Sequence, residues 1–446
     1  MQFDISSPGI LKGRTQIPGD LKITLSVLAF GMLSSEEVTI TNVSPSPDVE
    51  GFLDFLKSNG AVVDNSRDNI KLRGKAWHDT VVINAAVPDS IIHCVVASAA
   101  FTSNNVKIED GAGNRSFIVK PLLDLLKSVG LTVDNIAKDG KDIFVRGAFF
   151  SPPDIVKVGS LWAFETVIAA AFALRKPVVI AYPLQLISQS LNLLTLLGCK
   201  ITHSEDGNNR DNELSRRLAR AGGGKSRNIR KFEWTEKHNY DIIKIPGDAT
   251  IASAVCGTAA LLQGSDVTVE GVVWEQGRRG FFEALRRMKI NIEWKPDNDS
   301  HSFDSADIRV RWSKSEGINL SSEQALTMPS ELLVLGSVAA FASGKTVIFD
   351  DGGNTGMRRD SFKVLARGLE ILGAHVGDFT EGIILHGVQE LKGDSVDSDG
   401  KSDVALALAV AGLAAWGTTT ISGFRVNDYP LDEFLRIINN LSIAKQ

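Results

Sequence analysis

The chain has 446 residues, of which 43% are hydrophobic, and its formal net charge at pH 7 is -5. At roughly 150 residues per domain, this length predicts two or three folded units with large cores. The small acidic charge gives no general affinity for polyanions, so we do not expect nucleic acid as a partner. With no run of about 18 apolar residues and no basic segment followed by an apolar one at the N-terminus, we expect neither a membrane span nor an export signal.

The first distinctive stretch, residues 17–33, reads IPGDLKITLSVLAFGML and places a turn directly before an apolar helix. Gly19 permits a tight turn, and Asp20 is a natural N-cap for the helix that follows. The backbone N–H groups at such a helix start favour a phosphate or a carboxylate. A plain connection between elements gives the same pattern, so this stretch alone is weak evidence for a site.

A pattern of one amphipathic helix, a glycine or its equivalent, and a short β-branched strand recurs along the chain. It begins near residues 51, 121, 189, 280 and 364 and ends truncated at 432. The spacing of roughly 70 to 90 residues corresponds to one supersecondary unit per copy. The aligned glycine positions are Gly60, Gly130, Gly198, Lys289 and Gly373.

Each copy also contains a helical stretch that is apolar nearly all round, beginning near residues 22, 90, 161, 250, 331 and 403. Helices without a polar face must be buried on most sides, so these six should form the interiors. A strand rich in Val, Ile and Thr follows each one. The sequence therefore predicts an α/β fold of six βαβαββ units, three around each of two interiors.

The cysteines and the central polar segment carry less information. Cys94, Cys199 and Cys256 show no CxxC pair and no His at ligand spacing, so we expect buried, reduced thiols and no metal. Residues 204–238 are polar and basic, and we interpret them as a solvated loop near the boundary of the two lobes. Nucleic-acid binding by this loop is a third, weaker hypothesis.

Four segments resemble the enolpyruvyl transferase family and its EPSP synthase (3-phosphoshikimate 1-carboxyvinyltransferase) branch most closely. They are IPGDATIASA from residue 245, GRRGFFEALRRMKINIEW from 277, SELLVLGSVAAFASGKT from 330 and VALALAVAGLAAWG from 404. The resemblance covers essentially the whole chain. A MurA-type relationship is disfavoured because the loop GAGNRSF at residue 111 has no cysteine.

The resemblance implies a two-lobed inside-out α/β barrel, with residues 1–20 plus 242–446 as the C-terminal lobe and 21–241 as the N-terminal lobe. It implies a cytoplasmic, monomeric transferase of the shikimate pathway of aromatic amino acid biosynthesis. Such an enzyme needs no cofactor and transfers the enolpyruvyl group of phosphoenolpyruvate to a hydroxylated acceptor in the cleft between the lobes. Lys and Arg bind the anionic substrates, and a carboxylate takes the proton from the attacking hydroxyl.

Most of the family's site positions are substituted in the N-terminal half of this chain. The PG-x-KSxSxR pattern places Leu21 at the lysine and Ser26 at the arginine, although a slip of one residue returns Lys22 to the lysine position. The LRxRP segment keeps Arg115 and replaces the second arginine with Phe117. The SSQ triplet falls at residues 161–163, which read LWA.

The C-terminal half departs in the same way. The base position is Ser330, with Glu331 retained beside it, and the glutamate of the KESDR motif becomes Arg358. The arginine of the DHR motif becomes Asp403, and the late lysine becomes Asn427. These losses argue against ordinary EPSP synthase activity.

Two hypotheses follow for the function. In the first, the chain is an enolpyruvyl transferase with a rebuilt cleft, Glu331 is its candidate base, and a small anionic or hydroxylated metabolite such as phosphoenolpyruvate is its ligand. The candidate substrate-binding residues are Lys22, Arg115, Arg278, Ser330, Arg358, Arg359 and Asp403. In the second, the chain is a non-catalytic ligand-binding or regulatory paralogue, because substitutions in both halves are what drift without catalysis would produce.

Overall fold

The structure is a computed structural model of the chain, and its contacts divide the chain into two compact units. Unit 1 comprises Met1–Pro18 and Pro246–Gln446, and unit 2 comprises Gly19–Ile245. The described residues are 2–66, 69–75, 77–103, 105–109, 116–129, 132–136, 142–146, 150–183, 188–203, 227–235, 241–297, 302–349, 357–379, 382–388, 390–425 and 427–443. The lobe boundaries expected from the sequence, after residues 20 and 241, lie two and four residues from the ends of these units.

Unit 2 contains six described helices and twelve described strands. The helices are α1 (Leu21–Gly31), α2 (Pro47–Ser58), α3 (Ile92–Thr102), α4 (Ser116–Ser128), α5 (Leu161–Ala173) and α6 (Ser188–Leu196). The strands are β3 (Val38–Thr41), β4 (Val62–Ser66), β5 (Asn69–Arg73), β6 (Thr80–Ile83), β7 (Asn105–Glu109), β8 (Thr132–Ile136), β9 (Asp142–Arg146), β10 (Val156–Lys157), β11 (Val178–Pro183), β12 (Cys199–His203), β13 (Arg227–Trp234) and β14 (Ile242–Lys244).

Unit 1 contains seven described helices and twelve described strands. The helices are α8 (Ala249–Leu261), α9 (Gly280–Arg287), α10 (Ser322–Ala325), α11 (Leu332–Ala339), α12 (Met357–Ile371), α13 (Ser402–Ala414) and α14 (Tyr429–Leu441). The strands are β1 (Gln2–Ser6), β2 (Ile10–Gln16), β15 (Asp266–Val273), β16 (Asn291–Asp297), β17 (Ser305–Arg311), β18 (Asn319–Leu320), β19 (Lys345–Phe349), β20 (His375–Phe379), β21 (Gly382–His386), β22 (Ser395–Asp397), β23 (Thr418–Ser422) and β24 (Ser442–Ile443).

Five of the six sheets formed by the described residues share one pairing pattern. In this pattern the first two strands pair in parallel, and the third and fourth strands are each added antiparallel to their neighbour. Examples are β6-β7-β9-β8 and β18-β19-β21-β20. The sixth sheet, β1-β23-β22, has three strands. This recurrence supports the predicted βαβαββ repeat, although a complete sixfold repeat stays a prediction.

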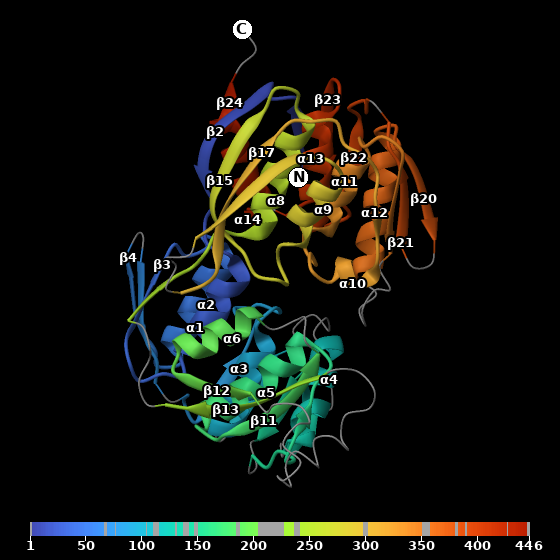
Figure 1. Cartoon of the computed structure of the whole chain (residues 1–446). Coiled ribbons are helices and arrows are strands. Elements are labelled where there is room, and N and C mark those ends of the chain that lie inside the picture. The colour runs from blue at the N-terminus through green and yellow to red at the C-terminus, as the bar shows by residue number, and fades with distance from the viewer. Residues whose placement is uncertain are drawn as a thin grey trace, which may run out of the picture. The chain divides into compact units, whose positions relative to one another are not determined.

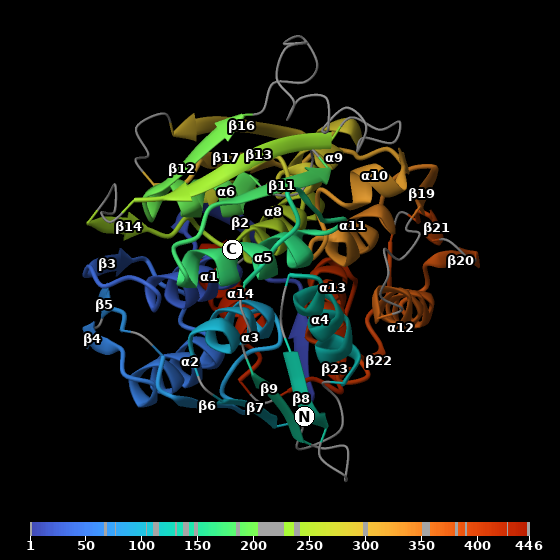
Figure 2. The same cartoon turned by 90° about the horizontal axis from the view of Figure 1, so that it is seen from below.

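The apolar helices lie inside the two units, as their sequences predict. In unit 2, α1, α3 and α5 lie between the sheets (Figure 2), and α3 contacts both of the others. In unit 1, α8, α11 and α13 contact one another and are enclosed by sheets and outer helices (Figure 1). Helices of this kind bury nearly every residue because neither side faces water.

Two strands join sheets far from their own place in the sequence. β2 pairs in parallel with β15, and β14 pairs in parallel with β3. Each therefore supplies the parallel strand that the local chain segment lacks. These pairings explain why the first 18 residues belong to unit 1 and why unit 2 ends at residue 245.

The aligned glycine positions share one backbone conformation. The φ angles of Gly60, Gly198 and Gly373 are 97°, 83° and 99°, and Lys289 adopts 64° at the equivalent position. This left-handed conformation ends a helix and favours glycine. Gly130, the fifth aligned position, lies outside the described residues.

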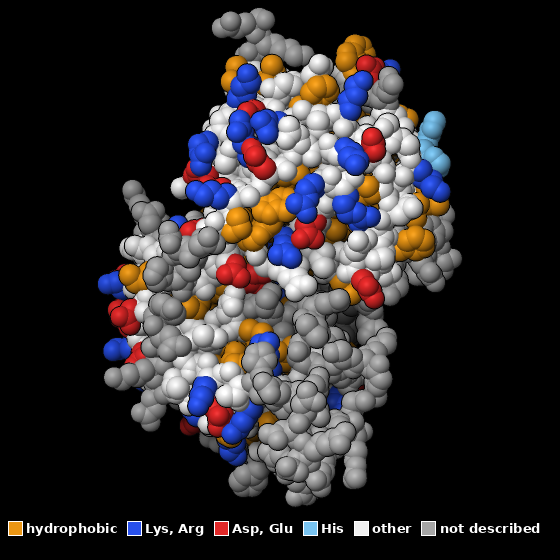
Figure 3. Space-filling model, in the orientation of Figure 1, with side chains coloured by type: hydrophobic (Ala, Val, Ile, Leu, Met, Phe, Trp, Pro, Cys, Tyr) orange, Lys and Arg blue, Asp and Glu red, His pale blue; other side chains and the backbone are white. Residues whose placement is uncertain are grey.

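Two further features concern the charge of the surface and the length of the helices. On the face in Figure 3, basic and acidic side chains of unit 1 lie interspersed. Elsewhere in unit 1, ion pairs between strands include that of Arg309 with Asp266, at 2.7 Å. No helix among the described residues is long and apolar enough to cross a membrane.

Candidate active site

The turn before α1 has the cap that the sequence predicts. The Asp20 Oδ1 atom accepts a hydrogen bond from the Ile23 backbone N–H at 3.0 Å. Gly19 is required for close approach, because a Cβ atom there would lie 1.8 Å from the backbone oxygen of Asn42. The N-cap prediction for Asp20 is therefore confirmed.

The corresponding turn in unit 1 is built the same way. The Asp248 Oδ1 atom accepts hydrogen bonds from the N–H groups of Thr250 at 2.8 Å and Ile251 at 3.3 Å. Each unit thus begins an interior helix with a capping aspartate, which leaves the backbone rigid at the start of the helix.

Lys22 lies near a buried carboxylate that the sequence analysis missed. Glu165 on α5 is 4% exposed, and its Oε1 atom accepts a hydrogen bond from the Ser190 hydroxyl at 2.7 Å. Burial raises the pKa of Glu165, but the charge of Lys22 and the hydrogen bonds from His93 and Ser190 outweigh it and lower the pKa to about 2. The carboxylate is therefore ionised at neutral pH, and it compensates part of the positive charge of Lys22.

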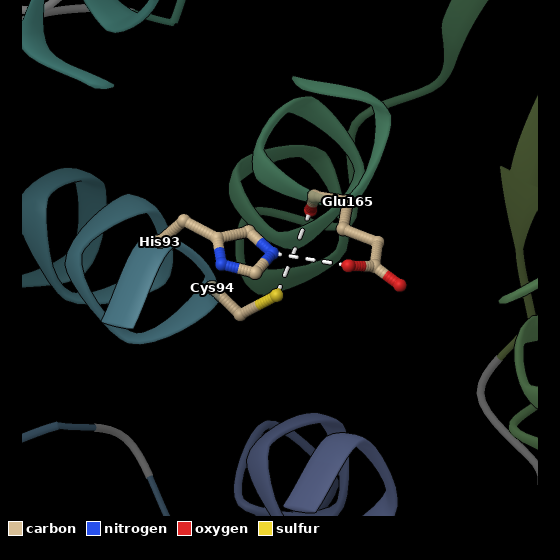
Figure 4. A group of neighbouring side chains, drawn as sticks. All are labelled: His93, Cys94 and Glu165. Atoms are coloured by element: carbon tan, nitrogen blue, oxygen red, sulfur yellow. Dashed lines mark hydrogen bonds and ion pairs between the residues drawn. The ribbon is translucent and has the colours of Figure 1, made fainter. Parts of the chain in front are cut away.

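His93 and Cys94 on α3 complete this buried cluster (Figure 4). The His93 Nε2 atom lies 3.1 Å from Glu165 Oε2, and the ring of half-buried Trp162 lies 5.4 Å from the imidazole between centroids. Burial and the nearby charge of Glu165 raise the pKa of the Cys94 thiol well above its usual range, although Lys22 opposes this. Cys94 is therefore a neutral thiol in this environment and not an activated nucleophile.

In unit 1, the structure brings together two of the predicted site residues. Arg278 Nη2 lies 3.1 Å from Glu331 Oε1, which also accepts a hydrogen bond from the Thr250 hydroxyl at 3.1 Å. The Glu331 side chain is fully buried, and that of Arg278 is 11% exposed. The Oε2 atom of Glu331 accepts no hydrogen bond from the described residues. The cluster thus combines a carboxylate oxygen that can take a proton with a cation that can stabilise developing negative charge.

Ser330 and Asp403, two further predicted site residues, do not join the cluster of Arg278 and Glu331. Both are exposed, and Asp403 accepts a hydrogen bond from the N–H of Val404 at 2.9 Å at the start of α13. Within the described part of the chain, neither makes a hydrogen bond or ion pair with Arg278 or Glu331. Asp403 lies in the first turn of α13, whose N-cap residue is Lys401.

The remaining predicted residues lie beyond what the structure describes. Arg115 is outside the described residues, as is most of the basic segment 204–238. Arg358 and Arg359 fall in the first turn of α12, and their side chains are not among those described. The roles proposed for these three arginines stay predictions.

Glu165 and His93 carried a recognisable signal in the sequence. Each is a polar residue within a helix that is otherwise almost wholly apolar, LWAFETVIAAAFA for α5 and IHCVVASAAFT for α3. A titratable group in such a helix must find a partner in the interior, because an isolated buried charge is costly. Searching the interior helices for polar residues would have found both, and Thr250 in α8 by the same reasoning.

Comparisons with known proteins agree with this architecture. The family model for EPSP synthase (3-phosphoshikimate 1-carboxyvinyltransferase) matches residues 224–438. Curated proteins named 3-phosphoshikimate 1-carboxyvinyltransferase from Desulfitobacterium hafniense and Roseiflexus are 23% and 25% identical to the chain. The first alignment covers 98% of this chain and 97% of that protein, and the second covers 98% of each.

Solved structures show the same fold. EPSP synthase from Acinetobacter baumannii superposes with a TM-score of 0.78 at 19% identity, covering 99% of this chain and 98% of that one. The enolpyruvyl transferase NikO from Streptomyces tendae gives a TM-score of 0.70 at 14% identity, covering 98% of this chain and 96% of that one. The predicted fold is therefore confirmed. The family model and the full-length curated relatives support an EPSP synthase-like relationship to the enolpyruvyl transferase family at low sequence identity.

Proposed function

We propose that the chain is an enolpyruvyl transferase that moves the enolpyruvyl group of phosphoenolpyruvate to a hydroxylated acceptor less anionic than 3-phosphoshikimate. The observation that carries this proposal is the buried pair of Glu331 and Arg278, with one carboxylate oxygen left without a hydrogen bond from the described residues. Glu331 stands next to the position where the family has its base. Arg278 fixes one oxygen of Glu331, and the other oxygen is available to accept a proton, which is the arrangement a general base needs.

The proposed chemistry assigns each group one task. Glu331 takes the proton from the acceptor hydroxyl, whose oxygen forms a bond to the enol carbon of phosphoenolpyruvate while an acid protonates the methylene carbon. Loss of the phosphate group together with a proton from the new methyl group then restores the double bond in the product. Arg278 stabilises negative charge that develops during this addition.

The acceptor class follows from the electrostatics. Four arginine or lysine partners of the family pattern are lost, and at about 1.5–3 kcal/mol each they represent roughly 6–12 kcal/mol of binding if additive. Two cations that remain act on carboxylates of the protein itself, since Arg278 pairs with Glu331 and the charge of Lys22 stabilises the ionised Glu165. A site with so little free positive charge favours an acceptor without a phosphate group.

The second candidate function is a non-catalytic ligand-binding or regulatory role. The observation that favours it is the complete burial of the Glu331 side chain, which leaves the carboxylate no exposed surface in this structure. On this alternative, the pair of Glu331 and Arg278 stabilises the fold of unit 1. The predicted lobe closure, monomeric state and cytoplasmic location stay predictions under both functions.

The test is phosphate release from phosphoenolpyruvate with a panel of hydroxylated acids, including 3-phosphoshikimate. We expect turnover with an unphosphorylated acceptor, and a rate lower by roughly 10² to 10⁴ in Glu331→Gln. Glu323→Gln, an exposed position on α10, is the matched control and should retain the rate.

Two outcomes would count against the transferase proposal. One is no release with any acceptor, and the other is an unchanged rate in Glu331→Gln. Thermal stabilisation by a metabolite without product would instead support the binding role, since a ligand at 100 times its dissociation constant adds about 2.7 kcal/mol. Failure to rescue an EPSP synthase-deficient strain is expected under both functions.

A further inference from the structure

The interior of unit 2 contains a cluster of side chains that are typical metal ligands. His93, Cys94 and Glu165 are 1%, 2% and 4% exposed. They come from two interior helices, α3 and α5, and their side chains converge between these helices (Figure 4). One donor atom from each residue lies within 4.8 Å of the donor atoms of the other two.

The hydrogen bonding of this cluster is incomplete. Glu165 is held through both oxygens, by Ser190 and by His93. The second ring nitrogen of His93, Nδ1, is buried and has no hydrogen-bond partner among the described residues. Among the described residues, the Cys94 thiol makes one long hydrogen-bond contact, of 4.0 Å, to the Glu165 carbonyl oxygen. The Nε2 atom of His93 faces Glu165, so Nε2, the thiol and the carboxylate are the groups that a cation between the two helices would use.

We propose that His93, Cys94 and Glu165 form a buried binding site for a thiophilic divalent cation, with Zn²⁺ as the first candidate. Imidazole nitrogen, thiolate sulfur and carboxylate oxygen are the three ligand types that zinc uses in proteins. From zinc–ligand bonds of about 2.0–2.3 Å, tetrahedral ligand atoms lie roughly 3.3–3.6 Å apart. The present separations of up to 4.8 Å therefore need a contraction of up to about 1.5 Å, which changes in the side-chain torsions would have to supply.

The surroundings provide both support for a cation and opposition to it. Ser190 holds the other carboxylate oxygen and so orients Glu165, as outer-shell hydrogen bonds orient metal ligands. When the cation binds, the Cys94 thiol loses its proton to solvent, so that thiolate and carboxylate together balance a divalent charge. The opposing charge is that of Lys22, whose influence reaches both Glu165 and Cys94. Removing Lys22 should therefore tighten metal binding.

This effect of Lys22 separates the metal site from the proposed transferase activity. If Lys22 binds an anionic substrate, Lys22→Met weakens phosphoenolpyruvate binding. The same substitution strengthens zinc binding if the metal site exists. The two proposals can therefore fail independently.

The experiment measures zinc on the full chain after removal of metal with a chelator under reducing conditions. Competition with a chromophoric chelator gives the affinity, and elemental analysis after gel filtration gives the stoichiometry. We expect one zinc per chain, lost or weakened at least about 100-fold in Cys94→Ser and Glu165→Gln, and about 10-fold in Ser190→Ala. Cys256→Ser is the matched control, because Cys256 is equally buried in α8 and belongs to none of the metal-ligand clusters of the described residues.

Cobalt substitution tests the thiolate directly. The wild-type chain and Cys256→Ser should show a sulfur-to-cobalt charge-transfer band that Cys94→Ser lacks. Circular dichroism establishes whether each variant is folded. If a core variant unfolds, Lys22→Met still tests the proposal, because this variant should bind zinc more tightly than the wild type. The proposal is overturned if the wild-type chain retains no zinc, if Cys94→Ser or Glu165→Gln retains it undiminished, or if Lys22→Met does not tighten it.

Discussion

Replacing Glu165 with glutamine should remove a defined part of the acid sensitivity of unit 2. The substitution keeps the size of the side chain and removes the charge that Lys22, His93 and Ser190 stabilise. Burial raises the pKa of Glu165, and these partners more than offset it, lowering the pKa from 4.5 to about 2. Because the folded-state pKa is below the unfolded one, the carboxylate contributes stability that is fully present well above pH 4.5 and is lost as the pH falls toward 2.

The size of the effect follows from the two pKa values. A difference of this size corresponds to about 3 kcal/mol of the free energy of unfolding at neutral pH. Between pH 7 and pH 3.5, the wild-type chain should lose about 1.4 kcal/mol of it through this one group. Glu165→Gln has no such group, so its stability should fall by that much less over the same interval.

The assay is urea unfolding at pH 7 and pH 3.5, followed by circular dichroism in buffer containing a metal chelator. The quantity of interest is the difference between the wild-type chain and the variant in the pH-dependent change, since other carboxylates contribute equally to both. Glu50→Gln, at an exposed position on α2, is the control and should behave like the wild type. An equal loss of stability in the wild-type chain and in Glu165→Gln would refute the proposed stabilisation of the buried carboxylate.

Three further predictions concern stability. Arg278→Met should lower the free energy of unfolding, measured in urea, by about 3–5 kcal/mol because it leaves the buried Glu331 carboxylate without its cation. The double variant Arg278→Met with Glu331→Leu should recover most of this loss. No loss of stability in the single variant would contradict the pairing. Lys289→Gly should raise the free energy of unfolding by about 0.5–1 kcal/mol, because the φ of 64° is strained for lysine. A lower melting temperature of this variant would contradict the prediction. Asp20→Ala and Asp248→Ala should each cost about 1 kcal/mol through loss of a helix cap, measured calorimetrically, and unchanged melting would show that the caps contribute nothing.

The sequence was most informative about the interior helices. Their uniform apolar character predicts burial on all sides, and the structure confirms this for α8 and α13. The repeat alignment also predicts that Lys289 stands where other units have glycine, and its left-handed backbone agrees. Both features depend on local sequence, and local patterns determine local conformation and burial directly.

The pairing of distant strands was not predictable in the same way. β2 pairs with β15, more than 200 residues later, and β14 pairs with β3. Alternating or β-branched sequence predicts a strand but does not identify its partner. The ends of the two units were therefore displaced by a few residues from those expected.

The candidate site shows the same division. The resemblance identified Arg278 and Glu331 separately, and only the structure shows that they form an ion pair across 53 residues of sequence. The cluster of His93, Cys94 and Glu165 was missed because hydrophobicity gives the burial of a helix but not which side chains of two helices meet. The expectation that Cys94 is a buried, reduced thiol is confirmed, and the expectation of no metal there stays a prediction.

The buried carboxylates Glu165 and Glu331 support one argument about the ligand. Glu331 is the N-cap residue of α11 and pairs with Arg278, whereas Glu165 lies in the second turn of α5 and is stabilised by the charge of Lys22. A cation that already neutralises a buried carboxylate can bind an anionic ligand only by weakening that pair, at a cost of several kcal/mol. A neutral or singly charged hydroxylated acceptor avoids this cost, because it can donate a hydrogen bond to the unsatisfied oxygen of Glu331 while the pair with Arg278 stays intact. The charge distribution within each unit therefore favours the same acceptor class as the lost family arginines do.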